Sequence, residues 1–444
     1  MAGSFYSALR RTGISYLEKI LNQEKTVNPA LFLVAPFILL LLLIALAPLF
    51  FQEWWSRHYP KVSFGLGGAV ILYYIFILQR SEIVLHTGQE YFSFIILIGS
   101  LFVVSGGINI STKDLTNPKE NILFLLGGAV IANLVGTTGA SMLLIRPWIR
   151  MNKIRIAPYH IVFFIFIVSN VGGVLTPIGD PPLFIGYLKG IPFFWVISRT
   201  FPMWCVAIGI LLLMFYILDK NNYDSTTRSI QKKIEKHDEW KVEGLNNILF
   251  LLIILAAVFI SSPPFLREAV IIIATVASYV TTKKTIHHAN HFTFHPIQEV
   301  AIIFAGIFAT MIPALELLAQ SASTMNYLST SFFFWNTGIL SSFLDNAPTY
   351  LSFFSVAIGS THDSTISVQT LLLSDEFSRQ IVAISVGAVF FGANTYIGNG
   401  PNFMVKSIAD HYHVPTPSFV KYISHFTLPF MVPMLIIVWL LFFL

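Results

Sequence analysis

Charged residues are scarce in this sequence. Asp, Glu, Lys and Arg make up 11% of its 444 residues, against about 25% in soluble domains. A soluble chain of this length needs water-facing surfaces that so little charge cannot cover. The scarcity excludes an ordinary soluble enzyme, a disordered chain and a nucleic-acid binder. Apolar residues make up 55%, with 41 Phe and a mean hydropathy of +0.72, which indicates that lipid is the main solvent.

Cysteine and the motifs of nucleotide and metal chemistry are also missing. Cys205 is the one cysteine, so no intramolecular disulfide can form. No GxxxxGK(S/T), HExxH or CxxC pattern occurs in the sequence. ATP hydrolysis by this chain is therefore not expected, and we expect no cofactor.

Twelve apolar runs qualify as membrane helices by hydropathy, for which about 20 residues suffice. They lie at 29–51, 62–79, 92–110, 121–145, 158–178, 190–218, 245–262, 267–282, 297–319, 332–357, 378–398 and 424–444. One long polar segment, 219–244, carries six basic and six acidic side chains. We therefore predict four regions. They are a polar or amphipathic N-terminal segment (1–28), a first membrane repeat (29–218), a cytoplasmic linker (219–244) and a second membrane repeat (245–444).

The two halves repeat the same motifs in the same order. The stretch GVLTPIGDPPLF from Gly173 realigns with GANTYIGNGPNF from Gly392, with six identical positions. Gln89-Glu90 and Gln298-Glu299 each open an apolar helix. Repeated halves with helices broken by glycine and proline at matching places are typical of secondary transporters.

The aligned stretches predict helices that unwind inside the membrane. Residues 170–182 concentrate Gly, Pro, Thr and Asn within an apolar run, and Pro181 and Pro182 remove two backbone donors. An unwound backbone at membrane depth must face protein or a water-filled cavity. Its free carbonyls, with Thr and Asn oxygens, suit a small cation such as Na⁺, whereas half-helix N-termini suit an anion. The alternative is a loop that only reaches the headgroups.

Two further runs break in the middle and predict re-entrant hairpins. The breaks are Val135-Gly-Thr-Thr-Gly139 and Leu344-Asp-Asn-Ala-Pro348, and a single kinked helix is the alternative for each. With both hairpins, we expect an all-α polytopic membrane protein of about 10–11 transmembrane helices plus two re-entrant hairpins, arranged as an inverted repeat.

The loops predict which side faces the cytoplasm. If 219–244 is cytoplasmic, so are 52–61, 111–120, 146–157, 283–296 and 405–421. These six loops carry 18 of the 27 Lys and Arg residues, which fits the positive-inside rule. We interpret the basic residues of 146–157, Arg155 among them, as a cytoplasmic anchor and His160 as an interfacial residue.

Four acidic residues are candidates for proton coupling. Asp180 in the first unwound stretch and Asp345 at the second hairpin tip lie at membrane depth, where ionisable groups are costly and usually functional. Each could hold either a proton or Na⁺, and that competition alone produces antiport. Helix capping is the alternative for Asp180 and an interfacial position for Asp345. Glu90 and Glu299 are explained by capping at helix starts, but their repetition keeps them as candidates.

At these motifs the sequence resembles the ion transporter superfamily, and most of all its NhaD-type sodium/proton antiporter branch. That branch is related to arsenite permeases, the pigment-cell P protein and citrate-type carriers. The resemblance covers the chain from about residue 60 to the C-terminus. It rests on the segments Gly136–Ser141, Ser169–Pro182, Phe343–Pro348 and Gly392–Asn402.

The resemblance implies an ion site between the first hairpin tip and the first unwound loop, with a pseudo-symmetric partner in the second half. The residues implied for ion or substrate binding are Gly136, Thr137, Thr138, Ser169, Asn170, Gly172, Gly173, Thr176, Asp180, Asp345, Asn346, Asn394, Thr395, Asn399 and Asn402. Thr137, Asn170, Thr176 and Asp180 would bind the transported Na⁺. Asn399 stands where the first half has Asp180, so the two sites cannot be chemically equal. The resemblance also makes a homodimer plausible.

The sequence therefore predicts a secondary transporter rather than an enzyme. We expect an integral protein of a bacterial inner membrane that exchanges Na⁺ or Li⁺ for H⁺ by alternating access. Its partners are the lipid bilayer and small ions, with no nucleic acid. One alternative is a sodium-coupled symporter of an organic anion such as citrate or a dicarboxylate, and another is an arsenite permease. An alternative of another class is an intramembrane aspartyl hydrolase using Asp180 and Asp345, although a hydrolase has no need of the repeated carbonyl-rich breaks.

Overall fold

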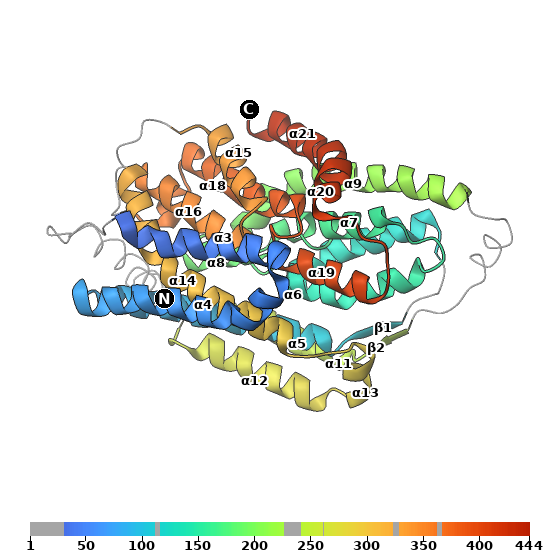
Figure 1. The fold of residues 1–444 in the computed structure, drawn as a ribbon, viewed down its shortest axis with the longest axis horizontal. Coiled ribbons are helices and arrows are strands. Elements are labelled where there is room, and N and C mark those ends of the chain that lie inside the picture. Colours follow the sequence, from blue (N-terminus) through green and yellow to red (C-terminus); the bar gives the residue numbers. More distant parts are fainter. Residues whose placement is uncertain (1–30, 112–115, 226–240, 261, 323–327, 362–365) are drawn as a thin grey trace, which may run out of the picture.

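Helices form nearly all the regular structure of the chain (Figure 1). The computed structural model describes residues 31–111, 116–225, 241–260, 262–322, 328–361 and 366–444. The predicted N-terminal segment 1–28 lies outside these residues, as does 226–240 of the predicted linker. An α-helix satisfies its own backbone hydrogen bonds, which is what a lipid environment demands.

The first half runs from η1 to α9. Its elements are η1 (Leu31–Val34), α3 (Ala35–Phe50), α4 (Gln52–Leu72), η2 (Tyr73–Ile77), α5 (Ser81–Gly106), β1 (Asn109–Ser111), α6 (Pro118–Met151), α7 (Pro158–Ile167), η3 (Val171–Leu175), α8 (Pro181–Leu188) and α9 (Phe193–Asp224). The strand β1 pairs antiparallel with β2 (Lys241–Glu243), so Asn109 lies opposite Glu243.

The second half runs from α11 to α21. Its elements are α11 (Asn246–Ala257), α12 (Leu266–Thr281), α13 (Lys284–Ala289), α14 (His295–Ala322), α15 (Thr330–Ser341), α16 (Asn346–Gly359), α17 (Val368–Leu371), α18 (Asp375–Phe391), η4 (Gly392–Asn394), α19 (Gly400–His411), α20 (Phe419–Tyr422), η5 (Ile423–Met431) and α21 (Val432–Phe442).

Eight helical segments of the described chain are long and apolar enough to cross a membrane. They are Leu31–Pro48, Glu53–Ile77, Ser81–Gly106, Pro118–Met151, Pro158–Leu175, Phe193–Asp224, His295–Ser321 and Phe419–Phe442. The prediction of an all-α polytopic membrane protein is confirmed. The shorter helices α11, α12 and α18 have 12, 16 and 17 residues, so length alone does not decide whether they cross.

The first predicted hairpin is present in α6. A straight helix of its 34 residues would hold its ends about 50 Å apart. Instead the Nδ2 of Asn121, near the start, donates to the Oδ1 of Asn152, just after the end, over 2.8 Å. The chain reverses at Gly136, whose backbone torsions are φ 77° and ψ 155°. Two half-helices therefore lie side by side with their tip at Gly136.

The second hairpin consists of α15 and α16. The chain leaves the helical conformation between Ser341 and Asn346. The ring centroids of Phe332 and Phe353, one on each helix, lie 6.4 Å apart in an edge-on contact. In Figure 1 this hairpin occupies the left of the molecule and α6 the right, so the two tips approach the centre from opposite ends. This is the arrangement of an inverted repeat.

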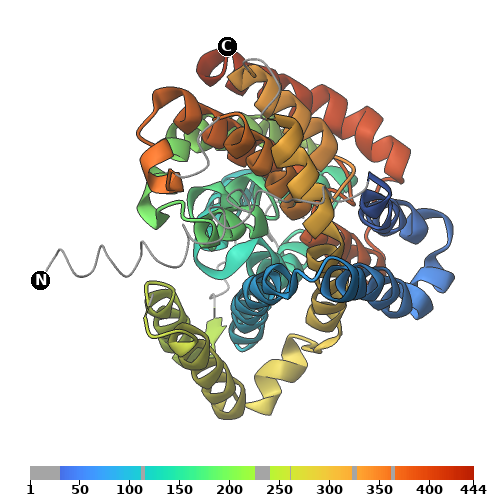
Figure 2. The same ribbon diagram turned by 90° about the vertical axis from the view of Figure 1, so that its left-hand side faces the viewer.

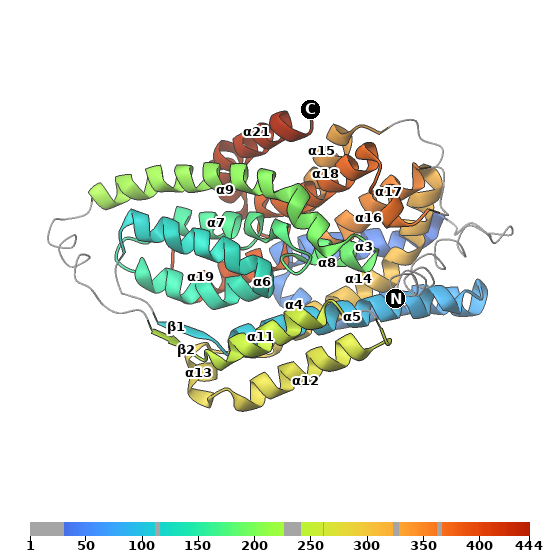
Figure 3. The same cartoon turned by 180° about the vertical axis from the view of Figure 1, so that it is seen from behind.

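The ends of several elements gather at one end of the molecule. The strands β1 and β2, the base of α6, α13 and the end of α19 all lie on the right in Figure 1. They belong to the loops predicted to face one side of the membrane. Figure 2 looks along the helices and shows α11 and α12 at one edge beside α5, and Figure 3 shows α9 running along the opposite side over α7.

Two predicted helix starts are wrong. Gln89-Glu90 does not open a helix, because α5 begins at Ser81 and runs through both residues; likewise α14 begins at His295, ahead of Glu299. The described residues of the predicted linker 219–244 include regular structure. Its first six residues continue α9, and Lys241–Glu243 forms β2. The polar composition after residue 218 suggested that the helix ends there. Asp219 instead continues α9, because it is buried and bonded to Arg155.

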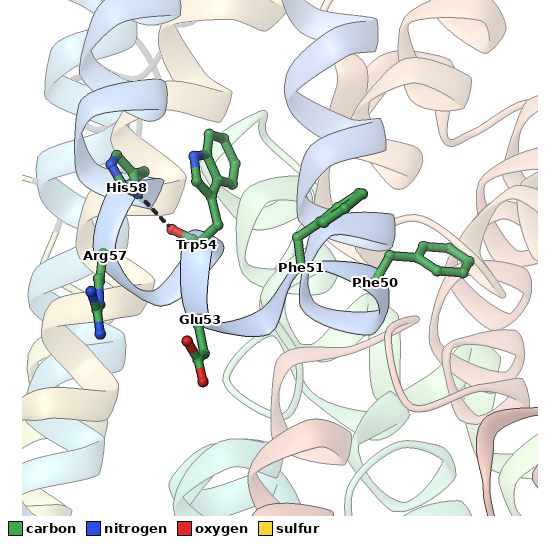
Figure 4. A pocket seen from close by; sticks show the side chains of 6 residues that line it. All are labelled: Phe50, Phe51, Glu53, Trp54, Arg57 and His58. Carbon is green, nitrogen blue, oxygen red and sulfur yellow. Dashed lines mark hydrogen bonds between the residues drawn. The ribbon is translucent and has the colours of Figure 1, made fainter.

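A surface hollow with a volume of about 530 Å³ lies at the turn between α3 and α4 (Figure 4). It is open, and its lining residues are Phe50, Phe51, Glu53, Trp54, Arg57 and His58. The ring of His58 stacks on that of Trp54, and its Nδ1 lies 2.8 Å from the Trp54 carbonyl oxygen. Aromatic and charged side chains at a helix end are typical of a membrane–water interface. The hollow shares no residue with the cluster described next.

Candidate central ion site

The buried carboxylate of Asp180 lies where motifs from the two halves of the chain meet. Asp180 is the residue before α8 and is 1% exposed. Its Oδ1 accepts hydrogen bonds from the Oγ1 of Thr137 over 2.5 Å and from the Nδ2 of Asn399 over 3.1 Å. Its Oδ2 accepts from the Nδ2 of Asn346 over 2.5 Å. The donors come from the first hairpin tip, the second unwound loop and the second hairpin, so residues that the sequence assigned to two separate sites meet at one carboxylate.

Every donor on Asp180 is neutral. Among the described residues, no Lys, Arg or His side chain bonds to this carboxylate. A buried carboxylate without a cationic partner is costly in a low-dielectric site. A proton or a bound cation can supply the missing positive charge. The site is therefore chemically suited to hold one or the other.

The first hairpin tip is fixed against the first unwound loop. The backbone N of Thr137 donates to the carbonyl of Gly179 over 2.7 Å, and this brings the Thr137 side chain onto Asp180. The reversal depends on Gly136, because φ 77° with ψ 155° is a conformation that side chains with a Cβ avoid. A Cβ there would also meet the carbonyl oxygen of Ile178 at 3.3 Å.

Replacing Gly136 with alanine is expected to destabilise the protein by about 1–3 kcal/mol through backbone strain and to slow transport by displacing Thr137. Gly127 offers a matched control in the same helix, because a Cβ there meets nothing within 4 Å. Gly127→Ala should leave stability unchanged or raise it by up to about 1 kcal/mol. Thermal unfolding of the purified proteins in detergent compares the two, and equal unfolding midpoints would contradict the expectation.

A ladder of asparagine side chains joins the two unwound loops. The Nδ2 of Asn170 donates to the Oδ1 of Asn402 over 2.7 Å, and the Nδ2 of Asn399 lies 3.1 Å from the Oδ1 of Asn170. Asn402 in turn donates to the carbonyls of Gly392 and Thr395 over 2.8 Å each. Asn170, Asn399 and Asn402 are thus brought together, with Asn399 bridging the ladder to Asp180. Ser169 adds a contact to Ser141, with their Oγ atoms 2.7 Å apart.

Two threonines occupy matching positions at the loop edges. The Oγ1 of Thr176 donates to the carbonyl of Asn133 over 2.7 Å, and the Oγ1 of Thr395 donates to that of Ser342 over 2.5 Å. Each hydroxyl also accepts from the backbone N of the glycine three residues on, Gly179 or Gly398. These side chains hold the loops to the hairpins. The Thr176 hydroxyl makes no hydrogen bond to Asp180, although the family resemblance implies both as Na⁺ ligands.

The remaining predicted residues surround this cluster. Gly172 accepts from Asn133 over 2.6 Å, and the backbone N of Gly173 donates to the Asn170 carbonyl over 2.9 Å. Asp345 caps α16, with its Oδ1 3.1 Å from the backbone N of Ala347. Thr138 follows Thr137 at the hairpin tip and is half-buried.

Two buried amide oxygens of the predicted site residues accept no hydrogen bond from the described residues. The Oδ1 atoms of Asn346 and Asn394 have no hydrogen-bond partner among the described residues. The Nδ2 of Asn394 donates to the Oγ of Ser342 over 2.9 Å, whereas the Nδ2 of Asn346 donates to the Oδ2 of Asp180. Amide and carboxylate oxygens are ligands that hard cations prefer. The described residues contain no group of three or more His, Cys, Asp or Glu side chains suited to a metal ion.

Glu90 and Glu299 do not join the cluster. The Nζ of Lys189 lies 2.7 Å and 2.9 Å from the two carboxylate oxygens of Glu90, and the Nδ1 of His86 lies 3.5 Å from one of them. Glu90 thereby ties α5 to the residue that follows α8. Glu299 is half-buried in α14. Neither acid bonds to Asp180.

Glu90→Gln and Glu299→Gln are therefore expected to keep transport, with rates lowered by less than about tenfold. Their side chains make no bond in the cluster, so their charge is not needed for loading it. The rate of Na⁺-dependent proton movement into proteoliposomes measures this. Complete loss of transport in either variant would make that acid part of the coupling machinery.

Sequence reasoning missed a second buried polar cluster. Asp219 accepts from both terminal nitrogens of Arg155, from the hydroxyl of Tyr159 over 2.9 Å and from the Nδ2 of Asn121 over 2.8 Å. The Nε2 of His160 lies 3.1 Å from the Asp219 Oδ1. The interpretations of Arg155 as a surface anchor and His160 as interfacial are wrong, since both are buried. Their partner, 64 positions after Arg155, is too far along the chain for local spacing to reveal it.

Broken helices, opposed hairpins and a buried polar centre between the hairpin tips define the class of the protein: it is a secondary transporter embedded in a membrane, not an enzyme. The sequence matches the family described as putative citrate transport over residues 26–443. The chain belongs to that family. It is thus a citrate-type carrier of the ion transporter class. No curated protein matches the chain.

Proposed function

We propose that the protein exchanges Na⁺ or Li⁺ for H⁺ at Asp180 by alternating access. The observation that carries the proposal is a buried carboxylate with three neutral donors on it. A group of this kind needs one positive charge when it is enclosed. A proton and an alkali cation both supply that charge, and binding of one displaces the other.

The surrounding oxygens favour an alkali cation as the second occupant. The Oδ1 atoms of Asn346 and Asn394 are unpartnered, and the Ser169 carbonyl lies within 3.2 Å of the Asn399 side chain that reaches Asp180. Rotating the Asn346 amide would turn its oxygen toward the carboxylate in place of its NH₂ group. Carboxylate, amide and carbonyl oxygens together suit Na⁺ or Li⁺ rather than a soft metal.

Exchange, rather than one-way transport, follows because the ionised Asp180 carboxylate is costly to bury without a bound proton or cation. A conformational change that carries Asp180 from one side to the other is easier with the charge neutralised than with it bare. The loaded states, one with H⁺ and one with the cation, can cross, whereas the unloaded state cannot. The two hairpins that enter from opposite ends supply a path to each side. In a bacterial inner membrane, the inward proton gradient would then drive Na⁺ out.

A second candidate is uptake of citrate or a similar organic anion coupled to a cation. The family description favours it, and so do the N-termini of α16 and α19, which begin at Asn346 and Gly400 beside the cluster. Against it stands the cluster's chemistry: Asp180 would repel the anion, and no basic side chain of the described chain bonds within the cluster to offset it.

The test is a pH-sensitive fluorescence assay in energised everted vesicles. Na⁺, Li⁺, K⁺, citrate and arsenite are added separately to vesicles with and without the protein. The proposal predicts that Na⁺ or Li⁺ collapses the pH gradient and that citrate does not. A response to no cation, together with Na⁺-dependent uptake of labelled citrate, would replace the antiporter with the second candidate.

A further inference from the structure

The second unwound loop presents an amide where the repeat calls for a carboxylate. Asn399 precedes α19 as Asp180 precedes α8, at an offset of 219 positions. Their backbones are nearly the same, with φ −153° and ψ 139° at Asn399 and φ −145° and ψ 145° at Asp180. Proline occupies both of the first two helical positions after Asp180 and the second one after Asn399. The two positions therefore differ in charge and hardly at all in shape.

The Asn399 side chain lies directly on Asp180. Its Nδ2 is 3.1 Å from the Oδ1 of Asp180, and the residue is 2% exposed. A carboxylate at 399 would place two acids in direct contact, and two carboxylates that share a site cannot both stay ionised without an added positive charge. The residue at 399 therefore decides whether the centre requires one positive charge or two.

Asp345 is the other acid of the repeated motifs, and it is engaged elsewhere. Its Oδ1 accepts from the backbone N of Ala347 over 3.1 Å at the start of α16. A carboxylate at a helix N-terminus is stabilised as an anion by the helix dipole and the free N–H groups. The Asp345 side chain makes its hydrogen bond at this helix start and none to the Asp180 or Asn399 side chains, so among the described residues Asp180 is the one carboxylate bonded to both unwound-loop and hairpin donors.

We propose that Asn399 sets the stoichiometry of transport by holding the centre to one carboxylate. Resting on the proposed function, the inference adds that one H⁺ exchanges for one monovalent cation and that no net charge crosses the membrane. A site with an acid in both loops would exchange more than one H⁺ for each cation and would respond to the membrane potential.

The test measures, for purified protein in proteoliposomes, the Na⁺ gradient at which net exchange stops (the zero-flux gradient). At a fixed difference of one pH unit, one-for-one exchange stops at a Na⁺ gradient of about tenfold, and a 2:1 exchange stops at about 100-fold. K⁺ and valinomycin set the membrane potential. The proposal expects the tenfold value, unchanged when the potential is varied. A zero-flux gradient that shifts with potential would overturn it, whereas absence of any Na⁺/H⁺ exchange would sink the proposed function itself.

Asn399→Asp adds the missing acid and should move the zero-flux gradient upward and make it depend on potential. Asn246→Asp is the matched control. It makes the same chemical change at the exposed first residue of α11, where a negative charge suits the helix dipole. The control should retain the wild-type zero-flux gradient. An active Asn399→Asp variant with the wild-type gradient would contradict the role of this residue. If the Asn399→Asp variant is inactive, the zero-flux gradient of the wild-type protein and its response to potential decide the proposal.

Discussion

Asp180→Asn is expected to abolish exchange of Na⁺ for H⁺, with a loss of more than about 100-fold in rate. Asparagine has nearly the shape of aspartate, but it carries no charge to attract a cation and cannot release a proton. One of its two polar atoms would also be an NH₂ group facing either Thr137 and Asn399 or Asn346, all of which are donors to Asp180 in the native site. Proton movement into proteoliposomes on addition of Na⁺ measures the effect.

The matched control for this prediction is Asp410→Asn. The Asp410 side chain pairs with Lys406 over 2.6 Å and is 45% exposed, so its charge lies in contact with solvent. The control should exchange cations at close to the wild-type rate. If the Asp180→Asn protein is folded and still exchanges Na⁺ for H⁺, the Asp180 carboxylate is not required for exchange.

Asp219→Ala is expected to destabilise the protein by about 3–5 kcal/mol, the cost of leaving a buried charge without its partner. The Arg155 side chain is 4% exposed and would lose both of its bonds to this carboxylate. The donors on Tyr159 and Asn121 would be left unpaired as well. Because Asp219 joins α9 to the base of the first hairpin and to α7, we expect less folded protein and a lower unfolding temperature.

Two variants separate loss of the buried pair from loss of an acid in general. Asp410→Ala removes an exposed partner and should cost no more than about 1 kcal/mol. The double variant Asp219→Leu, Arg155→Met removes both charges, and it should be more stable than Asp219→Ala, since no unpaired charge stays buried. Size-exclusion chromatography of detergent-solubilised protein after heating ranks the three. Equal survival of Asp219→Ala and Asp410→Ala would show that the cluster is not stabilising.

The motifs predicted the parts of the fold that depend on local chemistry. Gly136 marks a hairpin tip because glycine alone adopts its torsions without strain. Pro181, Pro182 and Pro401 mark the starts of short helices after unwound loops, since proline is tolerated in the first helical turn. The internal repeat allowed each break to be checked against its counterpart, and so both hairpins were predicted from the sequence.

The motifs did not predict which side chains far apart in the sequence bond to one another. Asp180 and Asn346 are 166 positions apart, and the repeat suggests that their elements meet without saying which atoms touch. Thr176 illustrates this limit, because its hydroxyl proved to hold the loop to Asn133. Asp219 illustrates another, since an acid at the polar end of an apolar helix has the same local pattern whether it is solvated or buried against Arg155.

The central claim is that Asp180 holds either a proton or Na⁺, and proton release on Na⁺ binding tests it most directly. Purified protein in weakly buffered detergent solution is titrated with NaCl while the pH is followed, with choline chloride as the control for ionic strength. We predict release of up to about one proton per protein on Na⁺ addition, with no release from the Asp180→Asn variant. Na⁺ binding without proton release, or equal release from the variant, would contradict the account.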